Sequence, residues 1–234
     1  MKAYFGDYVT LYRGQVYNRT SIAHQACCVA IGLGEPLAVM VDNKEHHLSL
    51  AVIPSMLRHQ IIKDNEVLFI FFEPHLDFAK SHRQFASQLH TRYTTFQNML
   101  FERLWEREGY DIDLAALYGY LCEALSFTSN EVDHRILHVR DFIVNHLYED
   151  LHIQRLADHA NLSVSRFQHL FKQTMGIPVV KYIHWQRLKT TCELILQGTS
   201  MTVAAHQGGF ADSAHFSRMF GYMFGMTPTS AFKK

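Results

Sequence analysis

The pattern of apolar and polar residues divides the chain into two parts with different periods. Up to residue 73, short apolar segments rich in β-branched and aromatic residues alternate with turn residues such as Gly34 and Pro36. This pattern predicts strands at residues 8–12, 26–31, 37–41, 48–53 and 67–72. Short strands at such regular spacing are typical of a small sandwich or barrel.

Helical spacing of the apolar residues begins near residue 76. It predicts one helix over residues 78–107 and a second helix whose leucines run from Leu114 to Leu125. Asp113 stands where it can cap the start of the second helix. Two amphipathic helices with a short connection form an antiparallel hairpin. The leucine stripe either covers the sheet or forms a dimer contact, and the sequence leaves both open.

The last hundred residues contain one helical arrangement twice. In the first copy, Ala157 is small enough for two short helices to cross closely, and Asn161 lies in the turn between them. Ser163 is a suitable cap for the second of these helices. A long helix is predicted over residues 179–196, after which the arrangement recurs with Asp212 as the cap. The repetition predicts two tandem helix-turn-helix units.

In the second helix of each unit, large apolar residues form a buried stripe and the remaining side chains lie on the outer side. Phe167 and Phe171 form the stripe in the first unit, and Phe216 and Phe220 form it in the second. Hydrogen-bonding side chains on an open helix face are what reading of the major groove requires. The candidate DNA-binding residues are Ser163, Ser165, Arg166, Gln168, His169, Lys172, Ser213, Ala214, His215, Ser217 and Arg218.

The second unit also carries a specific motif. Residues 209–220 (GFADSAHFSRMF) and 224–228 (FGMTP) resemble the signature of the AraC/XylS family of bacterial transcription factors. The first unit is similar to that family's first helix-turn-helix through Leu156, Ala157, Leu162, Ser163, Phe171, Lys172, Gly176 and Tyr182. The resemblance covers residues 134–234. It implies that the long helix holds both recognition helices on one side of the DNA, in successive major grooves about 34 Å apart.

The resemblance also implies roles for single residues. The family's base-reading positions fall on Ser165, Gln168 and His169 in the first unit, and on Ser213, Ala214 and Ser217 in the second. By the same resemblance, Arg166 and Arg218 serve bases or phosphates, and Lys172 serves a phosphate.

Three positions depart from the family's pattern. Ala204 and Gly208 are smaller than the residues usual there, and Gly221 stands where a basic residue is common. The base-reading positions of the second unit are also short side chains. We therefore expect a weaker second reading unit, with specificity resting mainly on the first.

The N-terminal part is similar to the cupin-like sensor domains of the same family through residues 53–59 (IPSMLRH). A cupin metal site would need two histidines one residue apart with a carboxylate close behind, and the sequence has no such run. His46 and His47 are adjacent, so on a strand they would point to opposite faces. We therefore predict no metal and no cofactor.

Charge is distributed unevenly along the chain. Residues 1–134 hold 11 Lys and Arg against 16 Asp and Glu, a net of −5, whereas residues 135–234 hold 11 against 6, a net of +5. A basic module joined to an acidic one suits a protein that faces phosphates. No apolar run reaches the length of a membrane span, and the N-terminus lacks the apolar stretch of a signal peptide. We expect a cytoplasmic protein whose four cysteines are reduced.

Together these patterns predict an α+β protein. A jelly-roll or cupin-like β domain with a helical hairpin is expected at residues 1–126 (strands 1–73, helices 76–126), a linker at 127–133 and an all-α tandem helix-turn-helix domain at 134–234. We expect a transcription regulator, more often an activator in this family, and no enzyme, because no catalytic motif is present. The expected partners are double-stranded promoter DNA, RNA polymerase, a small-molecule effector and a second copy bound through residues 76–126, with no membrane.

Two alternatives remain at this point. One is a cupin-like ligand-binding or metal-binding protein, or an enzyme, fused to an inert helical module. The other is a regulator that acts by pairing with another protein and binds DNA weakly.

Overall fold

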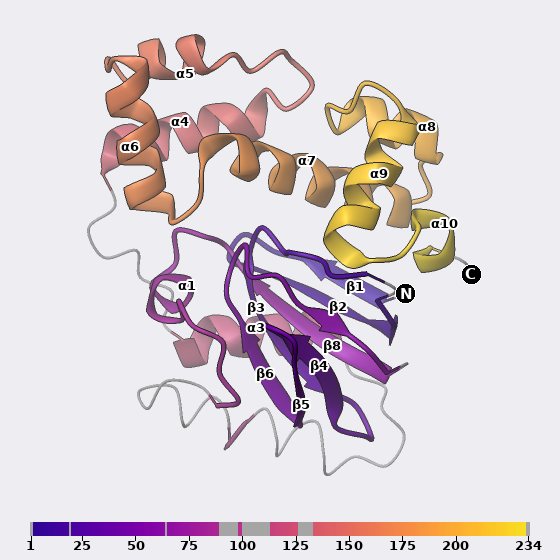
Figure 1. The fold of residues 1–234 in the computed structure, drawn as a ribbon. Coiled ribbons are helices and arrows are strands. Elements are labelled where there is room, and N and C mark those ends of the chain that lie inside the picture. Colours follow the sequence, from indigo (N-terminus) through magenta and orange to yellow (C-terminus); the bar gives the residue numbers. More distant parts are fainter. Residues whose placement is uncertain are drawn as a thin grey trace. The chain divides into compact units, whose positions relative to one another are not determined.

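The computed structural model describes residues 2–18, 20–63, 65–88, 98–99, 113–125 and 133–232. The chain forms two compact units: Met1–Thr128 together with Tyr222–Lys234, and Ser129–Gly221. Figure 1 gives the labels of the helices and strands. Within the described ranges, no helix is both long enough and apolar enough to cross a lipid bilayer.

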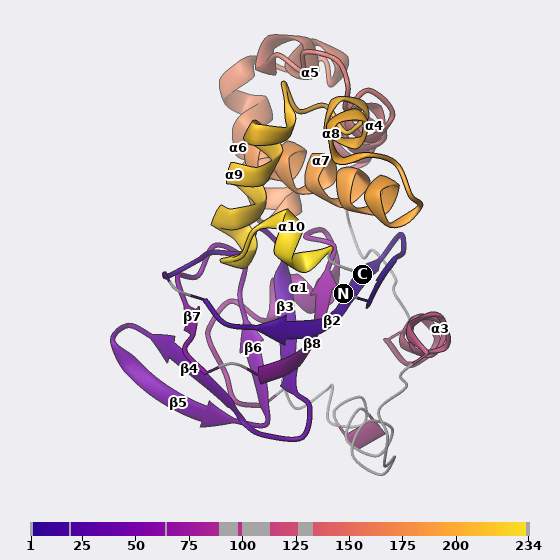
Figure 2. The same cartoon turned by 90° about the vertical axis from the view of Figure 1, so that its right-hand side faces the viewer.

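The first unit is built on two antiparallel sheets. The larger sheet has the strand order β1-β2-β8-β3-β6, and the smaller has the order β5-β4-β7. The strands are β1 (Lys2–Phe5), β2 (Val9–Val16), β3 (Cys27–Gly32), β4 (Leu37–Val41), β5 (Lys44–Leu48), β6 (Leu50–Ile53), β7 (Gln60–Ile61) and β8 (Asn65–Phe72). Figure 2 shows the β4–β5 hairpin and helix α3 (Leu114–Leu125) on opposite sides of the larger sheet.

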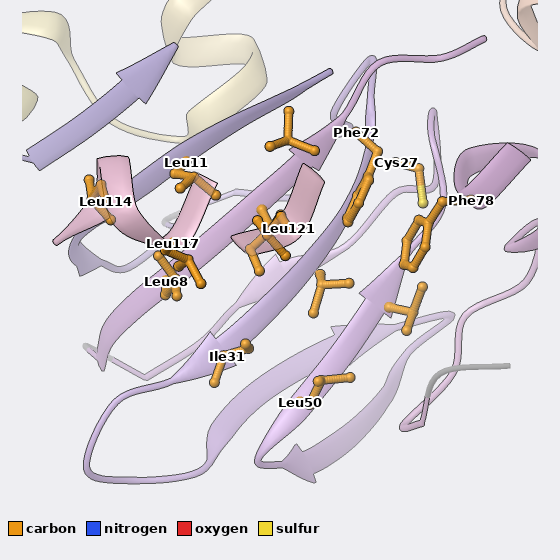
Figure 3. Close-up of a cluster of buried hydrophobic side chains, with 14 of the residues drawn as sticks. Leu11, Cys27, Ile31, Leu50, Leu68, Phe72, Phe78, Leu114, Leu117 and Leu121 are labelled. Atoms are coloured by element: carbon orange, nitrogen blue, oxygen red, sulfur yellow. The ribbon is translucent and has the colours of Figure 1, made fainter. Parts of the chain in front are cut away.

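One face of the larger sheet forms the main hydrophobic core. Its members alternate along the strands and include Val9, Leu11, Cys27, Val29, Ile31, Leu68, Ile70 and Phe72, with Leu114, Leu117 and Leu121 of α3. Figure 3 shows the three leucines of α3 directed at the strands. Phe72 also stacks on Phe78 of α1 (Asp77–Ser81), with 3.8 Å between ring centroids. Each buried side chain of this size stabilises the fold by about 1.5–3 kcal/mol.

The opposite face of the larger sheet carries aromatic and polar side chains. The ring of His24 lies 5.0 Å from that of Phe71 and 4.6 Å from that of His59. Burial lowers the pKa of His59 to about 4, and burial together with the neighbouring His59 lowers the pKa of His24 well below its usual value. The C-terminal segment of the same unit lies nearby, since Asn18 Nδ2 donates to the Phe224 carbonyl at 2.9 Å.

The regular secondary structure of the described residues 133–232 consists of helices joined by short loops. Its helices are α4 (His134–Asn145), α5 (Ile153–His159), α6 (Val164–Met175), α7 (Val179–Leu196), α8 (Met201–Gln207), α9 (Ser213–Phe224) and α10 (Pro228–Ala231). Ile136, Val139 and Ile143 form the fully buried face of α4. The long helix α7 packs against α4 and α6 as well as against α8. It is therefore the scaffold of the helical unit.

The structure confirms the predicted α+β class and most of the predicted elements. All five predicted strands are present with small differences at their ends, and α7 spans the predicted residues. Asp113 caps α3, because its Oδ1 accepts from the amides of Ala115 (2.9 Å) and Ala116 (3.1 Å). The predicted linker at 127–133 lies almost entirely outside the described residues.

The predicted helix over residues 78–107 is wrong in part. Helix α1 ends at Ser81, and residues 82–88 are not helical. Ala86 instead exchanges hydrogen bonds with Val52 at the edge of β6, at 2.8 and 3.2 Å. The unpaired backbone groups of a sheet edge thus outweigh the local helical pattern. Residues 89–97 and 100–112 lie outside the described residues.

Candidate nucleic-acid interface

The first helix-turn-helix unit is formed by α5 and α6. Leu156 and Ala157 are completely buried, which lets the two helices cross closely, as predicted. The turn is closed by a hydrogen bond from the Leu162 amide to the Ala157 carbonyl (3.0 Å), and Asn161 adopts a left-handed conformation with φ of 54°. Ser163 caps α6 by accepting from the Arg166 amide at 3.4 Å. Part of the hydrogen-bonding capacity of the Ser163 hydroxyl is therefore used within the helix.

Helix α6 separates its buried and exposed side chains sharply. Phe167 and Phe171 are completely buried. The predicted DNA-binding side chains on the other side are all exposed, namely Ser165, Arg166, Gln168, His169 and Lys172. The helix ends at Met175 and is followed by Gly176, whose left-handed conformation with φ of 77° terminates it. These side chains form a polar face that extends over about two turns of the helix.

The second unit is formed by α8 and α9 and repeats this design. Asp212 caps α9, with Oδ1 accepting from the His215 amide at 2.6 Å, as predicted. That hydrogen bond lowers the pKa of the Asp212 carboxyl. Phe216 and Phe220 are buried, and so is Met223, which the sequence analysis did not single out.

The outer side of α9 is less open than that of α6. Ala214 and Arg218 are exposed, whereas Ser213, His215 and Ser217 are half-buried. The ring of His215 lies against Phe210, with 5.3 Å between centroids. The Ser217 hydroxyl donates to the Ser213 carbonyl at 2.7 Å, so its proton is already used within the helix.

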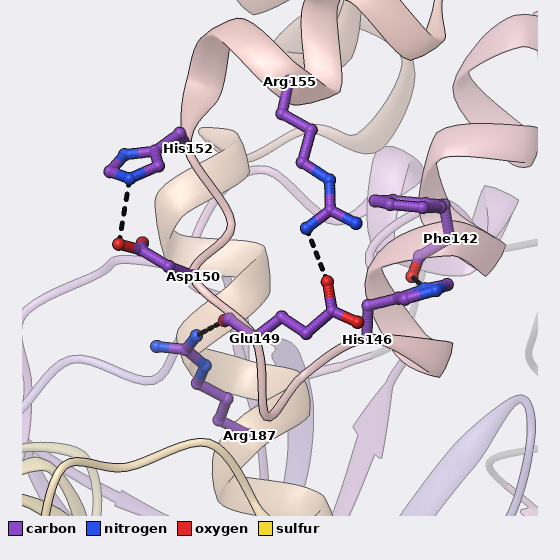
Figure 4. Close-up of polar contacts among 7 residues, drawn as sticks. All are labelled: Phe142, His146, Glu149, Asp150, His152, Arg155 and Arg187. Atoms are coloured by element: carbon purple, nitrogen blue, oxygen red, sulfur yellow. Dashed lines mark hydrogen bonds and ion pairs between the residues drawn. The ribbon is translucent and has the colours of Figure 1, made fainter.

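A set of polar contacts at the end of α4 was not found from the sequence. Arg187 of α7 donates from Nε to the Leu147 carbonyl and from Nη2 to the Glu149 carbonyl, each at 3.0 Å. Arg155 of α5 pairs with the Glu149 carboxylate at 2.5 Å, and its guanidinium lies 4.8 Å from the centre of the Phe142 ring. Figure 4 shows these side chains converging on the loop between α4 and α5. Only the polar character of Arg187 within a largely buried helix could have pointed to them.

Two pairs of histidines stand out among the described residues of the β domain: His24 with His59, described above, and the adjacent His46 and His47. His46 and His47 both lie on β5, where the ring of His46 packs 5.0 Å from Phe85 and the exposed His47 pairs with Glu45 at 2.9 Å. Across the parts of the chain that the structure describes, no group of three or more His, Cys, Asp or Glu side chains is arranged to hold a metal ion. The cysteines are free thiols, and Cys27, Cys28 and Cys192 are buried.

Comparison with known proteins identifies the helical module. Residues 156–234 match the helix-turn-helix domain family. Over 101 residues the chain is 35% identical to the arabinose operon regulatory protein of Escherichia coli, covering 42% of this chain and 34% of that protein. The C-terminal domain is of the AraC/XylS type. Another relative of this AraC/XylS-type domain is the probable transcriptional regulator LumQ of Photobacterium leiognathi, 32% identical over 92 residues, 39% of this chain and 37% of LumQ.

The sequence comparisons and the structural comparison cover different lengths of the chain. The chain spans about a third of the length of these curated relatives, so their sequence similarity concerns the AraC/XylS-type domain. Its fold is similar over most of its length to ToxT from Vibrio cholerae, with a TM-score of 0.55, 11% identity, and coverage of 95% of this chain and 96% of ToxT. This likeness establishes a shared fold of a β domain followed by helix-turn-helix units.

Proposed function

We propose that the protein is a transcription regulator whose AraC/XylS-type domain reads two neighbouring boxes of duplex promoter DNA. The observation that carries this proposal is the repetition of one design: α6 and α9 each begin at a side-chain cap, bury two phenylalanines and carry polar side chains on the other side. Side chains of this kind at the start of a recognition helix reach base edges in the major groove.

In this proposal α6 is the principal reader. Gln168 and His169 are exposed, and their side chains can donate and accept hydrogen bonds on base edges. Arg166 and Lys172 lie on the same exposed side and suit contacts with bases or phosphates. The net charge of +5 over residues 135–234 supplies the attraction that phosphate binding requires.

Helix α9 is proposed to read fewer bases. Ala214 has no hydrogen-bonding group, and the Ser217 proton is occupied by the Ser213 carbonyl. Arg218 is the exposed cation of this helix and suits a base or a phosphate. We therefore expect the second box to be shorter or less strictly defined than the first.

The β domain is proposed to carry regulation and dimerisation. It would bind a small-molecule effector and pair with a second copy through residues 76–126. Because Leu117 and Leu121 are buried against the sheet, the contact is proposed for the opposite side of α3, where the small residues Ala115, Ala116 and Gly119 are exposed. RNA polymerase is the expected partner at the promoter, and the cytoplasm is the compartment in which such a regulator meets chromosomal DNA.

The experiment that tests this function is enrichment of random duplex DNA on the purified full chain. Two boxes whose centres lie one helical turn apart are expected among the selected sequences. Affinity for the winning sequence should fall steeply with salt, because phosphate contacts release counterions. A protein that stays folded and enriches no sequence at low salt, with or without candidate effectors, would contradict the proposal.

A further inference from the structure

Three backbone segments of the AraC/XylS-type domain meet around one side chain, that of Arg187. The guanidinium reaches from α7 to the loop that follows α4, where Nε bonds the Leu147 carbonyl and Nη2 bonds the Glu149 carbonyl, both at 3.0 Å. These two carbonyls lie beyond the end of α4 and outside its helical hydrogen-bond ladder. Arg187 therefore ties the base of the first helix-turn-helix unit to the long helix.

The second unit reaches the same point from the other side. Gly209, in the turn between α8 and α9, has φ of 85°, and a Cβ atom built on it would lie 1.8 Å from the Leu147 carbonyl oxygen and 2.8 Å from Arg187 Nε. The turn of the second unit thus passes directly over the hydrogen bond between Arg187 and Leu147. Only glycine permits both this φ and this approach.

The surroundings of Arg187 favour a single conformation of its side chain. The side chain is half-buried, and this burial lowers the pKa of the guanidinium while Asp150 opposes the effect. Removing a cation from water is costly unless its hydrogen bonds are satisfied, which favours the one geometry that reaches both carbonyls. Two parallel donors from a rigid planar group also restrict rotation in a way that a single donor cannot.

We propose that Arg187 is a positioning residue that fixes the distance and angle between the recognition helices α6 and α9. It does so by locking the loop after α4, α7 and the turn before α9 at one junction. Arg187 itself need not touch DNA. This inference rests on the proposed reading of two boxes, and it adds that the permitted spacing of those boxes is set at this junction.

The direct test compares box spacings with Arg187→Gln and Arg187→Lys in the full chain. The probes are duplexes with the selected two-box sequence, the same sequence with one base pair inserted between the boxes, and one box alone. We expect wild type to discriminate strongly against the insertion, because one base pair moves the second box by about 3.4 Å and rotates it. Both variants should reduce this discrimination by about five- to tenfold and leave affinity for the single box within about twofold, since only the coupling of the units changes.

Arg155→Gln is the matched control. Arg155 contacts the same loop through the Glu149 carboxylate, but its partly exposed side chain makes no contact with α7 among the described hydrogen bonds and ion pairs. This variant should keep the spacing discrimination of wild type. Equal loss in Arg155→Gln and Arg187→Gln would overturn the assignment to Arg187, and so would unchanged discrimination in both Arg187 variants.

A second measurement separates this inference from the proposed function. Spin labels placed at Gln173 of α6 and Ala214 of α9, both exposed, report the distance between the helices without DNA, in a background in which the partly exposed Cys122 is replaced by Ser. Arg187→Gln should broaden or shift the distance distribution, whereas Arg155→Gln should not. A distribution unchanged by Arg187→Gln would overturn the inference even where DNA reading is established, and a broadened one would support it even where no operator has been selected.

Discussion

The hydroxyl of Thr191 occupies the space that a side chain at position 208 would need. A Cβ atom built on Gly208 would lie 1.9 Å from Thr191 Oγ1 and 3.1 Å from the Arg187 carbonyl oxygen. The hydroxyl is itself held in place, because it donates to that carbonyl at 2.8 Å. Gly208 thus leaves the space that the Thr191 hydroxyl occupies and allows α8 to pack closely on α7. Its small size, from which we expect a weaker second unit, therefore has a role in packing.

Gly208→Ala should therefore destabilise the helical domain by about 1–3 kcal/mol, the range for overpacking a well-filled site. Gly208 has φ of −78°, so alanine suffers no backbone strain, and the loss would come from the clash alone. Adding Thr191→Ala removes the clashing oxygen and should restore part of the stability. Urea unfolding of the two single variants and the double variant gives the coupling. If the changes in unfolding free energy of the two single variants add up to that of the double variant, the two residues do not interact.

Substitutions on α6 should distinguish side chains that recognise bases from side chains that bind phosphates. Gln168→Ala or His169→Ala should relax discrimination at one base pair by about 1–3 kcal/mol, the usual value of a base contact. Lys172→Ala should weaken binding to all sequences alike and reduce the salt slope by about 1. Titrations against a panel of single-base variants at several salt concentrations distinguish these outcomes.

The exposed Gln173, which lies next to Lys172 but outside the predicted set, supplies the control for α6. Gln173→Ala should alter neither discrimination nor salt slope. If Gln168→Ala and His169→Ala likewise leave binding to the selected site unchanged, the proposed orientation of α6 on DNA is wrong.

Acidification should destabilise the β domain through His24 and His59. Burial lowers the pKa of both imidazoles, that of His59 to about 4, so the folded state holds them neutral while the unfolded chain protonates near pH 6.5. Their stabilising contribution is present above pH 6.5 and is lost as pH falls from 6.5 towards 4. Each group can steepen the pH dependence of unfolding by up to about 1.4 kcal/mol per pH unit.

A matched pair of variants tests the source of that dependence. His24→Phe keeps a flat ring among Phe69, Phe71 and Phe224 and should flatten the pH profile of chemical unfolding between pH 6.5 and 4. The exposed His47→Gln should leave the profile as it is in wild type. An equally steep profile in His24→Phe would assign the dependence to other groups.

Dimerisation through α3 can be tested at Gly119. A Cβ atom there meets nothing within 4 Å, so Gly119→Arg should leave the fold intact and only obstruct close approach of a second copy. We expect Gly119→Arg to sediment as a monomer at concentrations where wild type and Gly119→Ala form dimers. Dimers of undiminished affinity in Gly119→Arg would place the contact elsewhere.

The helical domain was largely predictable because its signals are local. Helix α7 begins directly after Pro178 and ends at Leu196, as its apolar spacing indicated, and Ser163 and Asp212 act as caps. The β domain was harder to predict. Strands β5 (KEHHL) and β7 (QI) are polar or very short, and only pairing with β4 makes them strands.

The contacts of Arg187 and Thr191 could not be predicted for a different reason. The tertiary packing of α7 brings together residues that are 17 to 40 positions apart in the sequence. No periodicity of the sequence predicts such contacts. The same holds for the hydrogen bond from Asn18 to the Phe224 carbonyl, which joins residues 206 positions apart.

Rotating one box around the duplex tests whether one AraC/XylS-type domain inserts two recognition helices into successive major grooves. Inserting five base pairs between the selected boxes turns the second box by about half a helical turn. Insertion of two recognition helices requires that affinity for this duplex fall to that of a single box. Affinity equal to that of the uninterrupted site would contradict it, because it would mean that α9 does not read the second box.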